Sequence, residues 1–264
     1  MKKNVLLIAA AAVVLGSCNE AKQPVESVQE GRDALRAALS EIQEDSTLSD
    51  DEFDAAYYGV VAEFYDRHQH DSLALELFNT LVNNVWDNAT AQANYANADT
   101  LVQNNERVQH YMRLSEARAK TGAGAAYVDI AGPDVLDDSK QLSIASTLAE
   151  GKPVLLDFFA SWCPPCRRAI NNELPGLKEK YSGKLNILGI DVWENKKEDI
   201  DKAMGELPIT WPVIYTGGRD NSPAYLYGVQ SIPTVVLLSA DGTILARSHS
   251  LDDIMSELEK VAGE

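Results

Sequence analysis

The stretch Val154-Leu155-Leu156-Asp157-Phe158-Phe159-Ala160-Ser161-Trp162-Cys163-Pro164-Pro165-Cys166-Arg167 decides the fold of this chain. Apart from Asp157, residues 154–160 are aliphatic or aromatic, which predicts a buried strand. A helical pattern begins directly after Cys166. Cys163 therefore lies close to a helix N-terminus, where unpaired N–H groups and the helix dipole stabilise a thiolate.

Two residues between the cysteines allow the pair to alternate between dithiol and disulfide, so redox chemistry is the favoured interpretation. A structural zinc site is one alternative, but it needs four ligands, and the third cysteine, Cys18, lies far away in the sequence. The four histidines show no ligand spacing toward Cys163. An inert disulfide is the other alternative, although so short a loop gains little stability from closure. We expect a redox-active Cys163–Cys166 pair and neither a metal nor another cofactor.

Residues from about 125 to 261 resemble a thioredoxin-fold domain. They are most similar to the membrane-tethered, periplasm-facing branch typified by the TlpA and ResA thiol-disulfide oxidoreductases. The resemblance is specific because the Cys-Pro-Pro-Cys motif is followed later in the chain by Ile232-Pro233-Thr234. The matching segments cover about half of the chain and comprise residues 154–167, 186–191, 211–212, 227–238 and 240–245.

The resemblance implies a role for each residue of the motif. Cys163 is the expected nucleophile, because only a thiolate attacks a disulfide, and Cys166 is the expected resolving thiol. Pro164 and Pro165 stiffen the loop, since each proline fixes φ and removes an N–H donor. We expect both prolines to contact the substrate and to tune the redox potential.

The Ile232–Pro233 peptide bond is expected to be cis. The resemblance places Pro233 opposite the disulfide, with the backbone at Ile232 pairing with an extended substrate segment as an added strand. Trp162 is expected to cover the site as an apolar lid that contacts the substrate. An ordinary core aromatic is the alternative for Trp162.

Asp157 interrupts an otherwise apolar strand, and carboxylates are rarely buried without a partner or a role. Its position matches the buried aspartate of thioredoxins, which implies proton transfer to or from Cys166. Desolvation would raise its pKa and suit it to that task. The alternative is a strand-end aspartate bonded to the backbone. Thioredoxins carry a nearby lysine where this chain has Ile187, so no evident cation holds Asp157 ionised.

The N-terminal sequence has the pattern of an export signal. A basic start is followed by an apolar run over 5–15 that is too short to span a bilayer. The sequence then reads Leu15-Gly16-Ser17-Cys18, which resembles a bacterial lipobox. We expect a lipoprotein signal peptide over 1–18, lipid on Cys18, a tether over 19–31, and a lipid-anchored, periplasm-facing location in the cell envelope. An ordinary cleaved signal with a chance cysteine is the alternative.

The formal net charge of −17 argues against nucleic-acid binding and against electrostatic docking on anionic lipid. The expected partners are protein disulfide clients, a membrane thiol that donates electrons, and the membrane itself through the lipid.

The expected fold class is α+β, with an N-terminal all-α helical bundle over 32–121 and a thioredoxin-like α/β domain over 125–264. The first half has helical periodicity, with an N-cap at Ser49 and further helices starting at Asp71-Ser72 and at Asn88, but no convincing repeat of tetratricopeptide length. Its aromatic residues are expected in the core rather than in a binding groove, and His68-Gln69-His70 is expected as a solvated helix cap rather than a metal site. Pro175-Gly176 predicts a kink within 171–176.

The second half is expected to alternate strands and helices. Predicted helices cover 165–181, 196–205, 223–227 and 252–261. Asp241-Gly242 is expected as a hairpin turn. Predicted strands cover 127–130, 154–160, 185–192, 213–215, 234–238 and 243–247.

The expected function is a membrane-anchored thiol-disulfide oxidoreductase that reduces disulfides in exported proteins, with cytochrome c maturation as the first suggestion. A disulfide oxidase or isomerase of the same fold is one alternative, and a non-enzymatic envelope protein carrying a redox domain is another. Peroxide reduction is disfavoured, because Ala160 stands where peroxiredoxins place a threonine.

Overall fold

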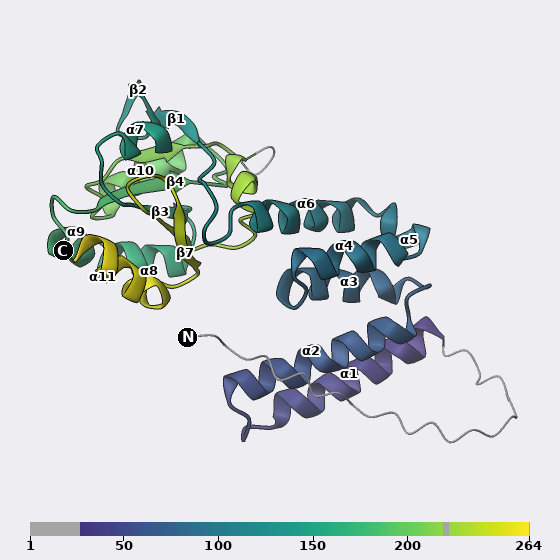
Figure 1. The fold of residues 1–264 in the computed structure, drawn as a ribbon. Helices are drawn as coiled ribbons and strands as arrows, with labels where there is room; N and C mark the ends of the chain where they lie inside the picture. The colour runs from purple at the N-terminus through teal and green to yellow at the C-terminus, as the bar shows by residue number, and fades with distance from the viewer. Residues whose placement is uncertain (1–26, 219–221, 264) are drawn as a thin grey trace, which may run out of the picture.

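The computed structural model describes residues 27–218 and 222–263, which form a helical region followed by a mixed α/β domain (Figure 1). This confirms the predicted fold class. The predicted signal peptide, the lipobox cysteine Cys18 and residues 19–26 lie outside the described residues. The first helix begins at Val28, earlier than the predicted end of the tether, because Ser27 and Glu30 form a capping box there.

No helix in the described parts of the chain combines the length and the hydropathy needed to cross a membrane.

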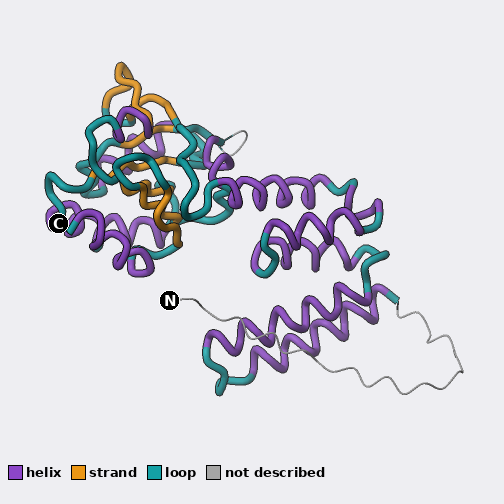
Figure 2. Tube along the Cα trace, in the orientation of Figure 1, coloured by secondary structure: helices purple, strands orange, loops and turns teal. Residues whose placement is uncertain are grey.

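The helical region is a series of mostly antiparallel helices in which each packs on a neighbour (Figures 1 and 2). Helix N-termini are capped by Ser49, Asp87, Asp99 and Asn105, whose side chains accept backbone N–H bonds. The helices are α1 (Val28–Glu44), α2 (Asp50–Arg67), α3 (Leu73–Asn84), α4 (Asn88–Asn97), α5 (Thr100–Gln103) and α6 (Glu106–Lys120).

Aromatic side chains fill the centre of this region. Tyr65, Phe78 and Trp86 meet edge to face, and Tyr65 and Phe78 are buried. His68 ends α2 as predicted, and the expectation of a solvated cap is wrong for His68 but holds for His70, whose side chain is 79% exposed. His68 is 4% exposed because Gly31 of α1 brings its backbone against the ring, which bonds Asp71 at 2.7 Å.

The α/β domain is built on one mixed sheet with the strand order β2-β1-β5-β4-β3-β6-β7. β3 lies near the middle, parallel to β4 and antiparallel to β6, and every residue in it is buried. The strands are β1 (Ala131–Asp134), β2 (Asp137–Ser143), β3 (Val154–Phe159), β4 (Asn186–Asp191), β5 (Val213–Tyr215), β6 (Thr234–Leu238) and β7 (Ile244–Ser248).

Helices cover both faces of the sheet. Residues of β3 alternate between two cores: Leu155 and Phe159 face one, whereas Val154, Leu156 and Phe158 face the other. The first core is completed by α8 (Pro164–Asn172), α9 (Leu174–Lys180), α10 (Lys197–Glu206) and α11 (Met255–Ala262). The second is completed by α7 (Ile144–Leu148) and the 3-10 helix η1 (Pro223–Tyr227). This alternation places Asp157 on the same face as α8.

The strand predicted over 127–130 is wrong. Ala126, just before it, forms an isolated bridge with Thr243, and within the segment only the Tyr127 N–H and the Ile130 carbonyl bond other backbone groups, those of Gly242 and Ile144. At Val128 the backbone bonds a side chain instead: the Val128 N–H donates to the Tyr227 hydroxyl, and that hydroxyl donates to the Val128 carbonyl. The edge hairpin β1–β2 was not predicted, because its residues are largely polar and exposed and show no apolar alternation.

The kink predicted within 171–176 is confirmed. The predicted helix over 165–181 is divided into α8 and α9 at Glu173, and Pro175 lies in the first turn of α9, where its missing N–H costs no helical bond. The helix predicted over 252–261 begins as a 3-10 turn, η2 (Asp252–Ile254), before α11. Gly242 has φ +87° in the predicted hairpin turn.

Candidate functional site

Cys163 and Cys166 form a disulfide at the start of α8. Cys163 is the N-cap residue, and its Sγ accepts the Cys166 N–H at 3.3 Å. Pro164 and Pro165 occupy the first helical turn, where a proline is well tolerated. Both cysteines are buried in the disulfide form, Cys163 at 3% and Cys166 at 1% exposure. A negative charge on Cys163 Sγ would meet a backbone donor and the positive end of α8.

The predicted cis peptide bond is present between Ile232 and Pro233. The Ile232 carbonyl oxygen lies 3.7 Å from Cys163 Sγ, although the two residues are 69 positions apart in the sequence. Ile232 and Pro233 are partly exposed. The Pro233 carbonyl accepts a bond at 2.8 Å from Nδ1 of His249, which holds the loop from the far side. The fold thus brings both predicted residues beside the disulfide.

Trp162 lies at the surface next to Cys163, with 47% of the residue exposed. The core-aromatic alternative is therefore wrong. Its indole Nε1 donates to the Trp193 carbonyl at 3.2 Å, which fixes the ring while leaving much of it open. Trp193 itself is buried and has φ +61°, a conformation that is costly for a bulky residue and that often marks functional sites.

Asp157 is 2% exposed and lies in the middle of β3. Its Oδ2 has no hydrogen-bond partner, so the backbone-bonded strand-end alternative does not describe it. Burial raises the pKa of Asp157 to about 7. The residue borders a cavity of about 180 Å³ that is also lined by Pro165, Pro233 and His249. A carboxyl that titrates near neutrality beside both halves of the redox site is suited to proton transfer.

Sequence reasoning missed a pair of buried carboxyl groups, Asp191 and Glu194, which lies below the Ser161–Trp162 turn. Glu194 is 2% exposed, accepts the Ser161 N–H and accepts the Ser161 hydroxyl at 3.0 Å. Asp191 is fully buried at the end of β4. Burial, followed by the charge of Glu194, raises the pKa of Asp191 to about 9. The signal available in the sequence was Asp191 directly after the apolar run of residues 187–190.

The turn that carries Trp162 and Cys163 is held from several directions. Arg167 donates to the Ser161 carbonyl at 3.1 Å and pairs with Glu206 at 3.1 Å. The Cys163 N–H donates to the Ala160 carbonyl at 3.1 Å. The disulfide is therefore presented on a tight turn between β3 and α8, with Glu194 beneath the turn and Asp157 on the α8 face of the sheet.

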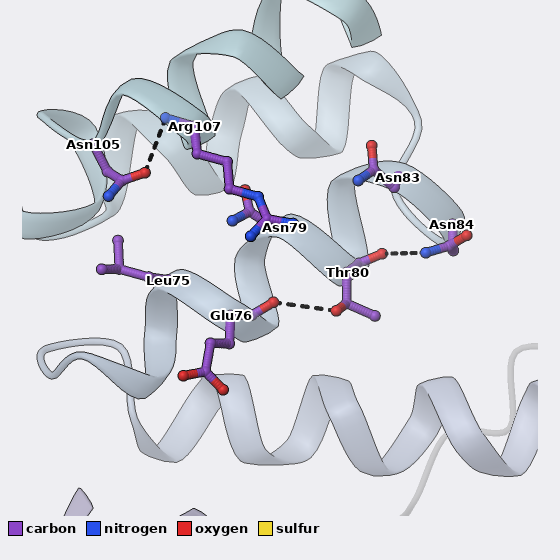
Figure 3. Close-up of a pocket in the computed structure, with 8 residues that line it drawn as sticks. All are labelled: Leu75, Glu76, Asn79, Thr80, Asn83, Asn84, Asn105 and Arg107. Atoms are coloured by element: carbon purple, nitrogen blue, oxygen red, sulfur yellow. Dashed lines mark hydrogen bonds between the residues drawn. The ribbon is translucent and has the colours of Figure 1, made fainter. Parts of the chain in front are cut away.

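A further cavity, of about 400 Å³, lies in the helical region (Figure 3). It is polar, and Arg107 of α6 reaches over Asn79 of α3 within it. None of the side chains that line it is a cysteine, so it has no part in the redox site. In the described ranges, no cluster of three or more histidine, cysteine or acidic side chains is arranged to hold a metal ion.

Residues 151–244 match a family model described as thioredoxin-like. The chain is 30% identical over 143 residues to the thiol-disulfide oxidoreductase ResA of Geobacillus thermodenitrificans, an alignment that covers 52% of this chain and 79% of ResA. It is 32% identical over 127 residues to tryparedoxin of Trypanosoma brucei brucei, covering 46% of this chain and 85% of tryparedoxin.

The thiol:disulfide interchange protein CycY of Rhizobium leguminosarum is 37% identical over 105 residues, which is 39% of this chain and 53% of CycY. The ResA and CycY alignments cover at most about half of this chain. The arrangement of the cysteine pair, the cis bond and Asp157 can exchange a dithiol for a disulfide.

Proposed function

We propose that this chain, which belongs to the TlpA- and ResA-like thioredoxin-fold thiol-disulfide oxidoreductases, reduces disulfides in exported proteins. The observation that carries the proposal is the Cys163–Cys166 disulfide at the N-terminus of α8, with Cys163 Sγ 3.7 Å from the carbonyl of Ile232 in a cis Ile232–Pro233 bond. An extended client segment would pair with the backbone at Ile232, so that its own disulfide meets Cys163.

In the proposed first step, the Cys163 thiolate attacks one sulfur of the client disulfide. A bond forms between Cys163 and that sulfur, the client S–S bond breaks, and the second client sulfur leaves as a thiolate that takes up a proton. The N–H of Cys166, 3.3 Å from Cys163 Sγ, and the dipole of α8 stabilise the attacking thiolate. Pro164, Pro165 and Trp162 form the surface that this client meets.

In the proposed second step, Cys166 gives its proton to Asp157 and attacks Cys163 Sγ. The Cys163–Cys166 disulfide forms, the mixed disulfide breaks, and the first client sulfur leaves as a thiolate and takes up a proton. Two electrons pass from the dithiol to the client. The pKa of about 7 allows Asp157 to accept a proton when it is ionised and to return it after turnover.

The cellular setting is part of the proposal. Residues 125–264 form the catalytic domain and residues 32–121 a helical domain that governs the choice or placement of clients. Lipid on Cys18 holds the chain to a membrane, facing the periplasm, and a membrane thiol reduces the Cys163–Cys166 disulfide after each turnover. Apocytochrome c is the first client to test. No further cofactor, metal or nucleic acid takes part.

The test is the reduction potential of the pair, measured by equilibration with glutathione, together with insulin reduction in dithiothreitol. A reductase requires a potential below that of its oxidising compartment, and for a two-electron couple about 30 mV corresponds to a tenfold change in the equilibrium constant. Cys163→Ala should abolish turnover, whereas Cys166→Ala should accumulate mixed disulfides with clients through Cys163. A potential well above that of the compartment would favour the oxidase alternative. If Cys163→Ala instead accumulated mixed disulfides with clients through Cys166, the assigned roles of the two cysteines would be reversed.

A further inference from the structure

The last helix of the helical region docks directly on the catalytic domain. α6 packs against η1, and Figure 1 shows the end of α6 beside that short helix. Gly228, which ends η1 at φ +58°, approaches α6 so closely that a Cβ there would lie 2.4 Å from the Leu114 carbonyl oxygen. Only glycine fits such a backbone contact.

Hydrogen bonds from two arginines also stabilise the junction between α6 and η1. Arg118 of α6 donates to the Gln230 side chain at 3.0 Å and to the Val82 carbonyl at 3.1 Å, and burial lowers its pKa. Arg247 of β7 donates to the carbonyls of Tyr227 and Gly228. The loop that runs on from η1 to the cis Ile232–Pro233 bond is therefore anchored by α6. The client-pairing backbone begins only two residues beyond Gln230.

A groove of about 460 Å³ opens at this junction. Its volume falls in the range of about 300–1,000 Å³ that is usual for binding pockets. Leu226 is 48% exposed in its wall, and none of the described side chains that line it is acidic, although the chain carries a net charge of −17. The side chains that decide its chemistry are His110, Arg113 and Leu114 of α6 and Pro223, Tyr225 and Leu226 of η1.

The groove is connected to the redox site through aromatic side chains. The ring of Tyr225 lies 5.3 Å from His110 and 6.4 Å from Trp193, measured between ring centroids. The Trp193 carbonyl in turn holds the exposed Trp162 beside Cys163. A series of side-chain contacts therefore joins the groove to the turn that carries the disulfide.

We propose that this groove binds the flanking segment of a client polypeptide whose disulfide lies at Cys163. The occupant is an extended segment that flanks the reacting cysteine and carries a large apolar side chain with an adjacent carboxylate. The apolar side chain packs against Leu226 and Tyr225, and the carboxylate meets Arg113. The helical region thereby supplies half of the client-binding surface. This inference rests on the proposed function, because it concerns the clients of the same disulfide.

The experiment compares kcat/KM for the reduction of three probes by the full chain. Two are linear peptides whose single cysteine is joined to glutathione; one carries Leu-Phe-Glu in the segment on either side of that cysteine, and the other carries Ser-Gly-Ser there. The third is glutathione disulfide, which has no such flank. We expect the Leu-Phe-Glu peptide to be preferred about tenfold over the Ser-Gly-Ser peptide.

Leu226→Asp should remove that preference and leave the reduction of glutathione disulfide unchanged. Arg113→Glu should weaken it in part, because the carboxylate would then meet a like charge. Leu136→Asp is the matched control, since Leu136 is also an exposed leucine (58%) but lies between β1 and β2. It should keep the full preference.

The outcomes separate the two proposals. A wild-type chain that reduces none of the three probes contradicts the proposed function itself. A chain that reduces all three without preference, or a Leu226→Asp variant that keeps the preference, overturns the groove alone. A Leu226→Asp variant that is equally slow on glutathione disulfide also overturns it, because the substitution would then act on the disulfide site rather than on the client flank.

Discussion

Buried carboxyl groups lie in two places around the disulfide, and the two places differ in the protonation state of their aspartate at neutral pH. Asp157 in β3 has a pKa of about 7 that is raised by burial. Asp191 at the end of β4 has a pKa of about 9, because the charge of Glu194 adds to the effect of burial. At neutral pH, Asp157 exchanges a proton readily, whereas Asp191 stays protonated.

The comparison teaches that burial alone does not make a proton carrier. A general base works best when its pKa lies near the working pH, and a second buried acid moves Asp191 beyond that range. Both carboxylate oxygens of Glu194 accept hydrogen bonds from Ser161, which lies in the turn before Cys163. The Asp157 side thus has a carboxyl whose pKa suits the proposed proton transfer, whereas the Asp191–Glu194 side holds the turn.

The largest expected effect is on stability. Both aspartates have a folded pKa above the unfolded value of 3.8, so each destabilises the fold increasingly as pH rises from about 4 to its folded pKa. Asp191→Asn should remove a cost on the order of several kcal/mol that develops between pH 4 and 9, since each pKa unit is about 1.4 kcal/mol. Urea unfolding at pH 4, 6, 8 and 9 measures it.

Asp157→Asn is the matched variant, and its stability difference from wild type should stop growing near pH 7. If both variants gave the same pH dependence, the two carboxyl groups would not differ as described.

The next effect is on catalysis. Asp157→Asn should slow the resolution of the mixed disulfide by about a hundredfold, because general base catalysis contributes about 10²–10⁴-fold. The wild-type rate should rise through pH 7, and the variant should lose that rise. Stopped-flow measurement of the second step, with Asp191→Asn as the control that retains the rise, tests the assignment. An unchanged pH–rate profile in Asp157→Asn would leave Asp157 without a role in proton transfer.

A smaller effect is expected on the redox potential. Glu194→Gln removes a buried negative charge near Cys163 while an amide can still bond Ser161. The Cys163 thiolate becomes more stable, so its pKa falls and the dithiol form is favoured by about tenfold, or about 30 mV. Glutathione equilibration above the thiol pKa measures the shift. The shift should disappear at a pH where the thiol is protonated, and a shift that is constant with pH would indicate a structural cause instead.

The smallest effect is expected at Trp162, whose indole N–H donates to the carbonyl of Trp193, the residue before Glu194. Trp162→Phe removes the bond to the Trp193 carbonyl and keeps the ring, so the free energy of unfolding should fall by at most about 1 kcal/mol. Thermal unfolding checks this value. A larger loss of unfolding free energy would mean that Trp162 holds the turn in place and does not only cover the disulfide.

Much of the α/β domain was predictable from local sequence. The strand β3, the cysteine junction with α8 and the turn at Gly242 follow from short patterns in which neighbours along the chain decide the structure. The cis bond at Pro233 came from the resemblance to thioredoxins and was confirmed. The hairpin of β1 and the edge strand β2 was missed because its residues show no apolar alternation, so that only pairing with neighbouring strands defines it.

By itself the sequence determined the chemistry: the vicinal cysteines on a helix N-terminus and the buried Asp157 in an apolar strand, since both depend on residues adjacent in the chain. Only the tertiary structure decided that Glu194 lies beneath Ser161, that Asp191 stays protonated, and that α6 closes against Gly228. The physical reason is that a pKa and a packing contact depend on the groups brought close in space. Here those groups come from separate strands and helices, and no local pattern records their distance.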